Sequence, residues 1–181
     1  MPELSVPAIE GEEREAVMGR RRPTCTIYTD GSCKWFKNPK LRHGGWAFIV
    51  ISDNDDESNI YRSGCYAPPQ TNQTMELLAV LEALRYVKEY GLRAHAITIH
   101  TDSMYVINGM TSQFRHHVAG GMEAPNSEIW LLLHRHAERC KKLSFKHVKG
   151  HAGDVWNEMC DKMAGRARQS GINLNRRTTN G

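Results

Sequence analysis

The stretch TNQTMELLAVLEALRYVKEY at residues 71–90 carries the strongest periodic pattern in the chain, and the other elements are placed around it. Its apolar residues recur every three or four positions, which puts them on one face of an α-helix. They are Leu77, Val80, Leu81, Leu84 and Val87. Thr71 or Asn72 is a suitable amino-terminal cap, and Gly91 is a suitable stop. The pattern predicts a helix over 71–90 that packs its apolar face on a sheet.

Strand-like segments precede this helix at residues 24–29, 45–52 and 59–67. The first alternates apolar and polar residues, the second is rich in β-formers, and a polar turn at 53–58 leads into the third. Strands that follow one another across short connections predict an antiparallel meander.

Strands and helices alternate after residue 90. We expect a strand at 96–101, helices at 103–110 and 126–143, a strand at 144–149 and a helix at 156–168, which Gly171 would end. Helical connections are long enough for right-handed crossovers between parallel strands. The prediction is an α/β fold of order βββαβααβα, with a five-stranded mixed sheet, three antiparallel strands then two parallel, flanked by helices.

Length and composition fit one globular domain: the chain has 181 residues, of which 40% are hydrophobic and 24% charged. Residues 1–22 lack aromatic side chains, and residues 171–181 are mostly Asn, Arg, Thr and Gly. We expect both to be flexible tails. This leaves 23–170 as the folded domain.

Several classes of protein are excluded. The longest apolar stretches, 46–51 and 129–133, fall far short of the ~20 residues of a membrane span. The five cysteines are scattered without a Cys-x-x-Cys pair, which disfavours a disulfide scaffold and a zinc finger. The first twenty residues lack the apolar core of a signal peptide, so we expect a cytoplasmic protein. A net charge of +4 permits nucleic-acid binding without requiring it.

Four carboxylates, Asp30, Glu76, Asp102 and Asp161, follow predicted strands or border the apolar stripes of predicted helices. Taken singly, Asp30 fits a turn, Asp102 fits a helix cap, and Glu76 or Asp161 fits a salt bridge. Together they can converge near the carboxyl ends of the strands, where open α/β sheets bind ligands. Because close like charges repel, such a cluster indicates Mg²⁺ and metal-assisted phosphoryl transfer.

Five motifs resemble those of type 1 ribonuclease H. They are YTDGSC at 28–33, NQTMEL at 72–77, TDS at 101–103, VKGHAG at 148–153 and NEMCD at 157–161. All four acidic residues occur in order, and the expected element order agrees. The resemblance implies the ribonuclease H-like fold, a catalytic domain at 23–170, and an endoribonuclease that hydrolyses the RNA strand of RNA/DNA hybrids.

The resemblance also implies two Mg²⁺ ions and products with 3′-hydroxyl and 5′-phosphate ends. Asp30 would bridge both ions, Asp161 would complete the site of the ion that activates water, and Glu76 and Asp102 would hold the other. Two such ions stabilise the attacking and leaving oxygens of an in-line displacement. Mn²⁺ is expected to substitute, since it prefers the same oxygen ligands.

His151 matches an auxiliary catalytic histidine of the family, although a loop histidine is otherwise an ordinary surface residue. It would move a proton or ease product release, which titration near neutral pH and flanking glycines suit. Substrate contacts, including those to the 2′-hydroxyls that mark RNA, are expected from the following residues. They are Gly31, Ser32, Cys33, Asn38, Thr71, Asn72, Gln73 and Asn157.

The chain departs from the family pattern in four places. The connection at 34–43 is longer and more basic than the glycine-rich turn of many bacterial relatives, and it could grip a phosphate backbone. Met104 replaces a glutamine that reads bases in many members. Residues 115–125 nearly lack lysine where many members carry a basic protrusion, and Phe114 lies one position past a DNA-stacking aromatic.

Two other functions are compatible with the fold: a hybrid-binding module without turnover, and a DNA-cutting nuclease of the same superfamily. The presence of all four acids disfavours the module. The loop at 150–153 and the spacing of 157–161 favour the hybrid nuclease. We expect a monomer with an RNA/DNA hybrid as its partner and no membrane association.

Overall fold

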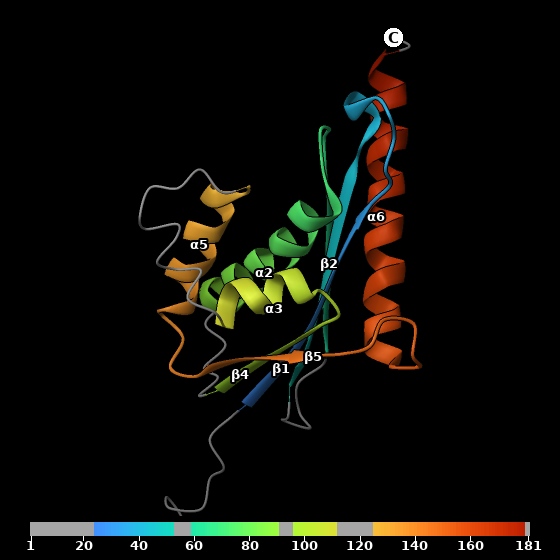
Figure 1. Cartoon of the computed structure of the whole chain (residues 1–181). Helices are drawn as coiled ribbons and strands as arrows, with labels where there is room; N and C mark the ends of the chain where they lie inside the picture. The colour runs from blue at the N-terminus through green and yellow to red at the C-terminus, as the bar shows by residue number, and fades with distance from the viewer. Residues whose placement is uncertain (1–23, 53–58, 91–95, 112–124, 180–181) are drawn as a thin grey trace, which may run out of the picture.

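A computed structural model of the chain describes residues 24–52, 59–90, 96–111 and 125–179. The strands are β1 (Thr24–Cys33), β2 (Gly44–Ser52), β3 (Ile60–Tyr66), β4 (Ala96–Thr101) and β5 (Leu143–His147). The helices are the 3-10 turn η1 (Pro39–Leu41), α2 (Asn72–Glu89), α3 (Met104–Thr111), α5 (Ser127–Ala137) and α6 (Val155–Thr179). Apart from the short η1, this order is the predicted one (Figure 1).

The five strands form one mixed sheet in the order β3-β2-β1-β4-β5. β2 pairs antiparallel with β1 and β3, whereas β4 pairs parallel with β1 and β5. The predicted α/β architecture is therefore confirmed. β1 is central, and its carboxyl end lies beside that of β4, where a cleft is expected.

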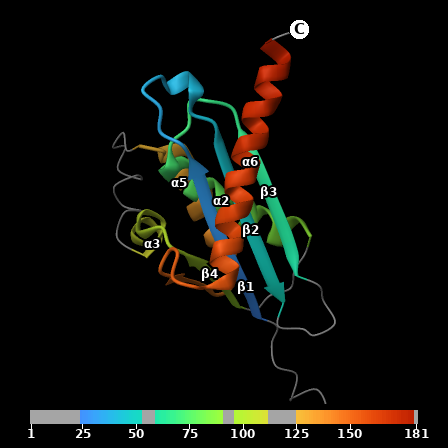
Figure 2. The ribbon, with the colours of Figure 1, turned by 90° about the vertical axis from the view of Figure 1, so that its right-hand side faces the viewer.

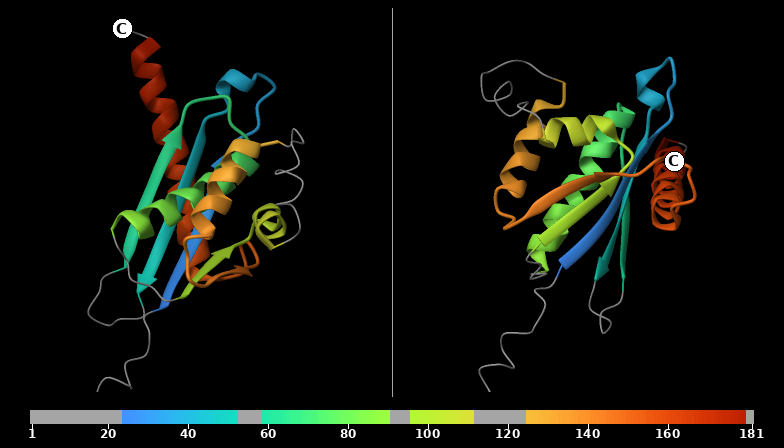
Figure 3. Two further views of the ribbon diagram at one scale, coloured as in Figure 1. Left: turned by 90° about the vertical axis from the view of Figure 1, so that its left-hand side faces the viewer. Right: turned by 60° about the horizontal axis from the view of Figure 1, so that its bottom comes forward.

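Helices cover both faces of the sheet: α2, α3 and α5 lie on one side and α6 on the other (Figures 1 and 3). The larger core fills the space between the sheet and α2. Its buried side chains include Ile27, Phe48, Ile99, Leu77, Leu81, Leu84, Trp130 and Leu133. A smaller core beneath α6 contains Tyr28, Ala47, Ile49, Val148, Cys160 and Ala164. Neighbouring Ile27 and Tyr28 thus face opposite cores, as the two-residue period of a strand requires.

The predicted helix at 71–90 is confirmed as α2, with Thr71 as its cap: the Thr71 side chain accepts a hydrogen bond from the Thr74 amide at 3.1 Å. The first strand is longer than predicted, because β1 continues through Asp30 to Cys33. Asp30 is paired opposite Ala47 within the ladder, so its interpretation as a turn residue is wrong.

The helix expected at 126–143 is shorter, since α5 ends at Ala137. A turn closes there, in which the Cys140 amide donates to the Ala137 carbonyl at 3.0 Å. Leu143 then starts β5 and pairs with Ile97. Leu143 fits the apolar spacing of the preceding helix, which is why the helix was predicted to reach it. It packs against the larger core as part of β5 instead.

The last helix is longer than predicted. α6 runs to Thr179, so its predicted end at residue 168 is wrong, as is the absence of regular structure at 171–179. Gly171 is buried against β3, where a Cβ would lie 3.1 Å from the Cys65 Cβ. Gly171 therefore does not end the helix. It allows α6 to pass close to the sheet.

The expected tail at 1–22, Phe114 and residues 115–124 lie outside the described residues. Within the described ranges, none of the helices is both long and apolar enough to span a membrane.

Candidate active site

Asp30 and Glu76 are brought together by the close approach of β1 and α2. Gly31 follows Asp30 on the strand, and a Cβ at Gly31 would overlap the backbone nitrogen of Glu76. Only glycine permits this spacing. Both carboxylates are buried, with 5% of Asp30 and 6% of Glu76 exposed.

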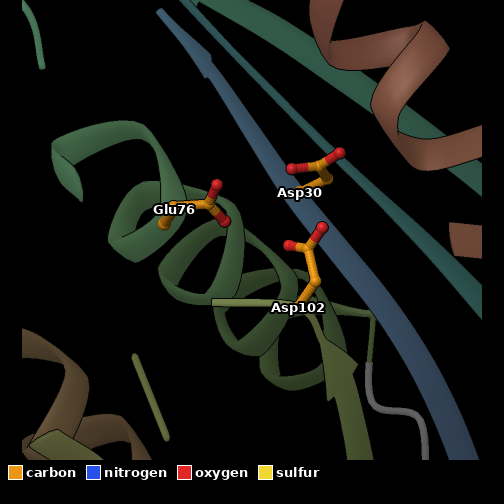
Figure 4. A group of neighbouring side chains, drawn as sticks. All are labelled: Asp30, Glu76 and Asp102. Atoms are coloured by element: carbon orange, nitrogen blue, oxygen red, sulfur yellow. The ribbon is translucent and has the colours of Figure 1, made fainter. Parts of the chain in front are cut away.

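Asp102 joins this pair from the strand next to β1. It follows Thr101, the last residue of β4, and the loop backbone at Gly150 closes over it. A Cβ at Gly150 would lie 2.7 Å from one carboxylate oxygen of Asp102. Ligand atoms of Asp30, Glu76 and Asp102 all lie within 4.8 Å of one another. Their carboxylates point toward a common space, as Figure 4 shows.

These carboxylates open into a cleft of about 410 Å³. Its lining includes all four predicted acids and His151; the full set is Asp30, Gly31, Ser32, Asn72, Gln73, Glu76, Asp102, Ser103, His151, Asn157 and Asp161. His151 is exposed and has a left-handed backbone conformation, with φ of 55°. The cleft therefore has a buried acidic floor and an accessible rim.

α6 supplies Asn157 and Asp161 from the opposite face of the sheet. Asp154 caps this helix, because its Oδ1 accepts hydrogen bonds from the amides of Trp156 and Asn157, both at 3.1 Å. Asn157 and Asp161 are four residues apart and so share a helix face. Gly45 of β2 allows α6 to lie close, since a Cβ there would overlap the Ala164 carbonyl.

Burial and mutual repulsion set the charge of the acidic floor. The pKa of Asp30 is raised to about 7, first by burial and then by the neighbouring charges of Asp102 and Asp161. The pKa of Glu76 is also raised well above its ordinary value, by burial and then by Asp30 and Asp102. We infer that, without a cation, Asp30 and Glu76 share a proton near neutral pH.

Two buried oxygen atoms at the cleft have no hydrogen-bond partner among the described residues. They are Oε2 of Glu76 and Oδ1 of Asn157. The other Glu76 oxygen accepts from the Asn72 amide at 3.3 Å. Buried acceptors are normally satisfied, and clustered carboxylate and amide oxygens are the ligands that hard divalent cations prefer. The donor set therefore fits such a cation.

The residues expected to contact substrate divide into two groups. Gly31, Ser32, Asn72, Gln73 and Asn157 line the cleft. Cys33, Asn38 and Thr71 are not among its lining residues.

Each of these three residues makes a hydrogen bond within the chain. The Cys33 amide, which was expected to meet substrate, donates to the Asn72 side chain at 3.0 Å. Asn38 caps η1 by accepting from the Lys40 amide at 3.0 Å. The Thr71 side chain caps α2. All three therefore have structural roles in this structure.

Sequence reasoning missed one cleft residue, Ser103, and two residues that hold cleft residues in place, Asp154 and Arg168. Ser103 lines the cleft next to Asp102. Arg168 donates from Nε to Oγ of Ser32 at 3.2 Å. Its position seven residues after Asp161 was a usable signal, because that spacing returns to the same helix face. Asp154 was detectable as a cap directly before the helix.

Comparisons with known proteins agree with this geometry. The family model described as RNase H matches residues 22–169. A protein named Ribonuclease H from Treponema pallidum subsp. pallidum is 35% identical over 155 residues, covering 77% of this chain and 87% of the relative. The structure of LC9-RNase H1, a type 1 RNase H with the type 2 active-site motif, matches with a TM-score of 0.71 at 25% identity, covering 83% of this chain and 74% of that one.

A further structural match is LC11-RNase H1 in complex with an RNA/DNA hybrid, with a TM-score of 0.61 at 19% identity. The match covers 82% of this chain and 99% of that one. At this identity the match shows a shared fold.

Proposed function

The chain belongs to the ribonuclease H family, and we propose that it cuts the RNA strand of RNA/DNA hybrids in this cleft, using Mg²⁺ and leaving 3′-hydroxyl and 5′-phosphate ends. The observation that carries the proposal is the convergence of Asp30, Glu76 and Asp102 within 4.8 Å. Three separate segments hold these like charges together, with Asp30 and Glu76 buried and Asp102 half-buried. This arrangement is unfavourable without a cation. A binding module would have no need of it.

The proposed mechanism uses two cations held by different carboxylates. Glu76 and Asp102 would hold one ion, Asp161 would hold the other, and Asp30 would contact both. When bound, such ions stabilise the charge on the attacking and leaving oxygens of an in-line displacement. Mn²⁺ would substitute for Mg²⁺, because both accept oxygen ligands.

The chain's own groups bind, orient and move protons around that centre. Both Asp30 and Glu76 would have to be ionised to act as ligands. Asn157 and Asn72 direct amide groups to the cleft, and Asn72 fixes Glu76 through its hydrogen bond of 3.3 Å. His151 at the exposed rim would move a proton or ease release of the 5′-phosphate product.

The remaining parts of the proposal concern the setting of the enzyme. We propose a monomer that acts in the cytoplasm, with a catalytic domain that extends beyond the predicted 23–170, because α6 continues to Thr179. The five cysteines all lie in the described part of the chain and form no disulfide, which is compatible with a reducing compartment.

Cleavage of end-labelled substrates tests the proposal. The panel contains an RNA/DNA hybrid, double-stranded DNA, double-stranded RNA and single-stranded RNA, each with Mg²⁺, Mn²⁺ or chelator. The expected result is metal-dependent cutting of the hybrid alone. Cutting of the DNA duplexes would favour a DNA nuclease, and tight hybrid binding without cutting in either metal would favour a binding module.

A further inference from the structure

The connection between β1 and β2 is unusually positive. Residues 31–52 contain no Asp or Glu, and the connection carries Lys34, Lys37, Lys40 and Arg42. All three lysines are exposed. The salt bridge found among the described residues is Arg85–Glu82. Within that part of the chain, the side chains of Lys34, Lys37, Lys40 and Arg42 therefore form no salt bridge with a carboxylate. We call residues 34–42 the basic loop.

Arg42 is held in a defined position at the surface of the basic loop. Its guanidinium lies 5.3 Å from the centre of the Trp35 ring, and its Nε donates to the Phe36 carbonyl at 2.7 Å. Trp35 is 73% exposed, although large aromatic side chains are seldom left in water. The cation–π contact and the hydrogen bond together orient Arg42 before any ligand arrives.

The basic loop is fastened to the edge of the cleft. The Gln70 amide donates to the Arg42 carbonyl at 2.9 Å, and the Cys33 thiol donates to the Gln70 carbonyl at 3.3 Å. Gln70 lies two residues before Asn72 of the cleft wall. The loop stands at the carboxyl end of β1 (Figures 1 and 2).

Arg168 extends the positive surface from the loop to the cleft. It donates to Ser32, a cleft residue. Burial raises the pKa of the Cys33 thiol, while the charges of Arg168 and Arg42 oppose that increase, so both guanidinium groups lie close to Cys33. Positively charged arginine side chains therefore lie beside the acidic cleft, next to Ser32.

From this arrangement we propose that the basic loop and Arg168 bind the phosphate backbone of the hybrid next to the cleft. The inference rests on the proposed function. A cleft floored by carboxylates repels phosphates, whereas cations at its edge attract the polyanion and fix its position. A preoriented guanidinium suits phosphate oxygens, and Trp35 serves as its support.

Hybrid binding measured by fluorescence anisotropy tests the inference, with chelator present so that no cleavage occurs. The variant Lys34→Ala/Lys37→Ala/Lys40→Ala is compared with Lys88→Ala/Lys141→Ala/Lys142→Ala. This control removes the same charge from exposed lysines at the carboxyl end of α2 and in the connection between α5 and β5. The loop variant should bind about tenfold more weakly, and the slope of log affinity against log salt should fall by roughly 2. The control variant should match the wild type.

Trp35 variants test the support of Arg42 separately. Trp35→Ala should weaken binding by about two- to fivefold, and Trp35→Phe should restore most of the loss, because a ring again lies under the guanidinium. Equal affinity and equal salt slope for the loop variant, the control variant and the wild type would overturn the inference. Failure of the wild type to cleave hybrids in the separate cleavage assay would instead overturn the proposed function.

Discussion

The cleft has two halves that are built differently. Its floor, formed by Asp30 and Glu76, is buried and fixed by the contact of β1 with α2 through Gly31. Its rim, formed by His151 and Asp161, is more accessible and is carried by a loop and by α6. A buried floor concentrates negative charge and fixes the geometry for cations. An accessible rim permits contact with substrate and solvent. We therefore expect substitution of any carboxylate that would hold a cation to abolish the reaction, and substitution of His151 at the rim to slow it.

Asp102→Asn should have the largest effect on activity. Removing this carboxylate should lower the rate of hybrid cleavage by at least about 1000-fold, because it would hold a cation that stabilises the transition state. Hybrid binding should be largely retained. Without metal, the Tm should rise, since repulsion with Asp30 is relieved. Single-turnover cleavage, anisotropy and thermal unfolding in chelator measure the three effects, and a near wild-type rate would remove Asp102 from the site.

Gly31→Ala tests whether close packing fixes the floor. The new methyl group meets the backbone of α2 and must displace it, which should cost about 1 to 3 kcal/mol of unfolding free energy and about 100-fold in rate. Gly165→Ala is the matched control, because a Cβ there meets nothing within 4 Å. It should be neutral or stabilising in urea unfolding. Equal behaviour of the two variants would refute the packing argument.

His151→Ala should have a smaller effect on activity than the floor variants. We expect the rate at saturating substrate to fall by about 10- to 100-fold with unchanged unfolding free energy, because the side chain is exposed. An unchanged rate would return His151 to an ordinary surface residue.

The smallest effect is a dependence of metal-free stability on pH. The pKa of Asp30 is raised from 3.8 to about 7, so the folded protein keeps a proton that the unfolded chain loses above pH ~4. Stability should therefore decrease as the pH rises from about 4 to about 7. Tm values across this range in chelator check the decrease. Saturating Mg²⁺ should reduce it, and Asp30→Asn should flatten it; a wild-type Tm that instead rises would contradict the raised pKa.

Sequence patterns predicted the element order well because each element has a local period. The Leu77 to Val87 stripe and the alternation around Ile27 required only neighbouring residues. The motifs likewise led to the four acids, which the structure places in one cleft. Local patterns and motifs therefore yielded the fold and the membership of the cleft.

Long-range contacts were harder to predict. Asp30 resembled a turn residue, yet pairing with Ala47 keeps it in β1. Gly171 resembled a helix end, yet it is where α6 passes close to Cys65. Both positions are determined by a segment that is distant in sequence, and a local sequence pattern does not show which segment that is.

The most direct test of the account follows both strands of one RNA/DNA hybrid, each carrying its own label, under single-turnover conditions. The wild-type enzyme is first mixed with the hybrid in chelator, and Mg²⁺ in excess is then added. The account predicts no cutting before the addition, and afterwards cutting of the RNA strand alone to 3′-hydroxyl and 5′-phosphate ends. Cutting in chelator, cutting of the DNA strand, or no cutting by a folded protein that binds both hybrid and Mg²⁺ would contradict it.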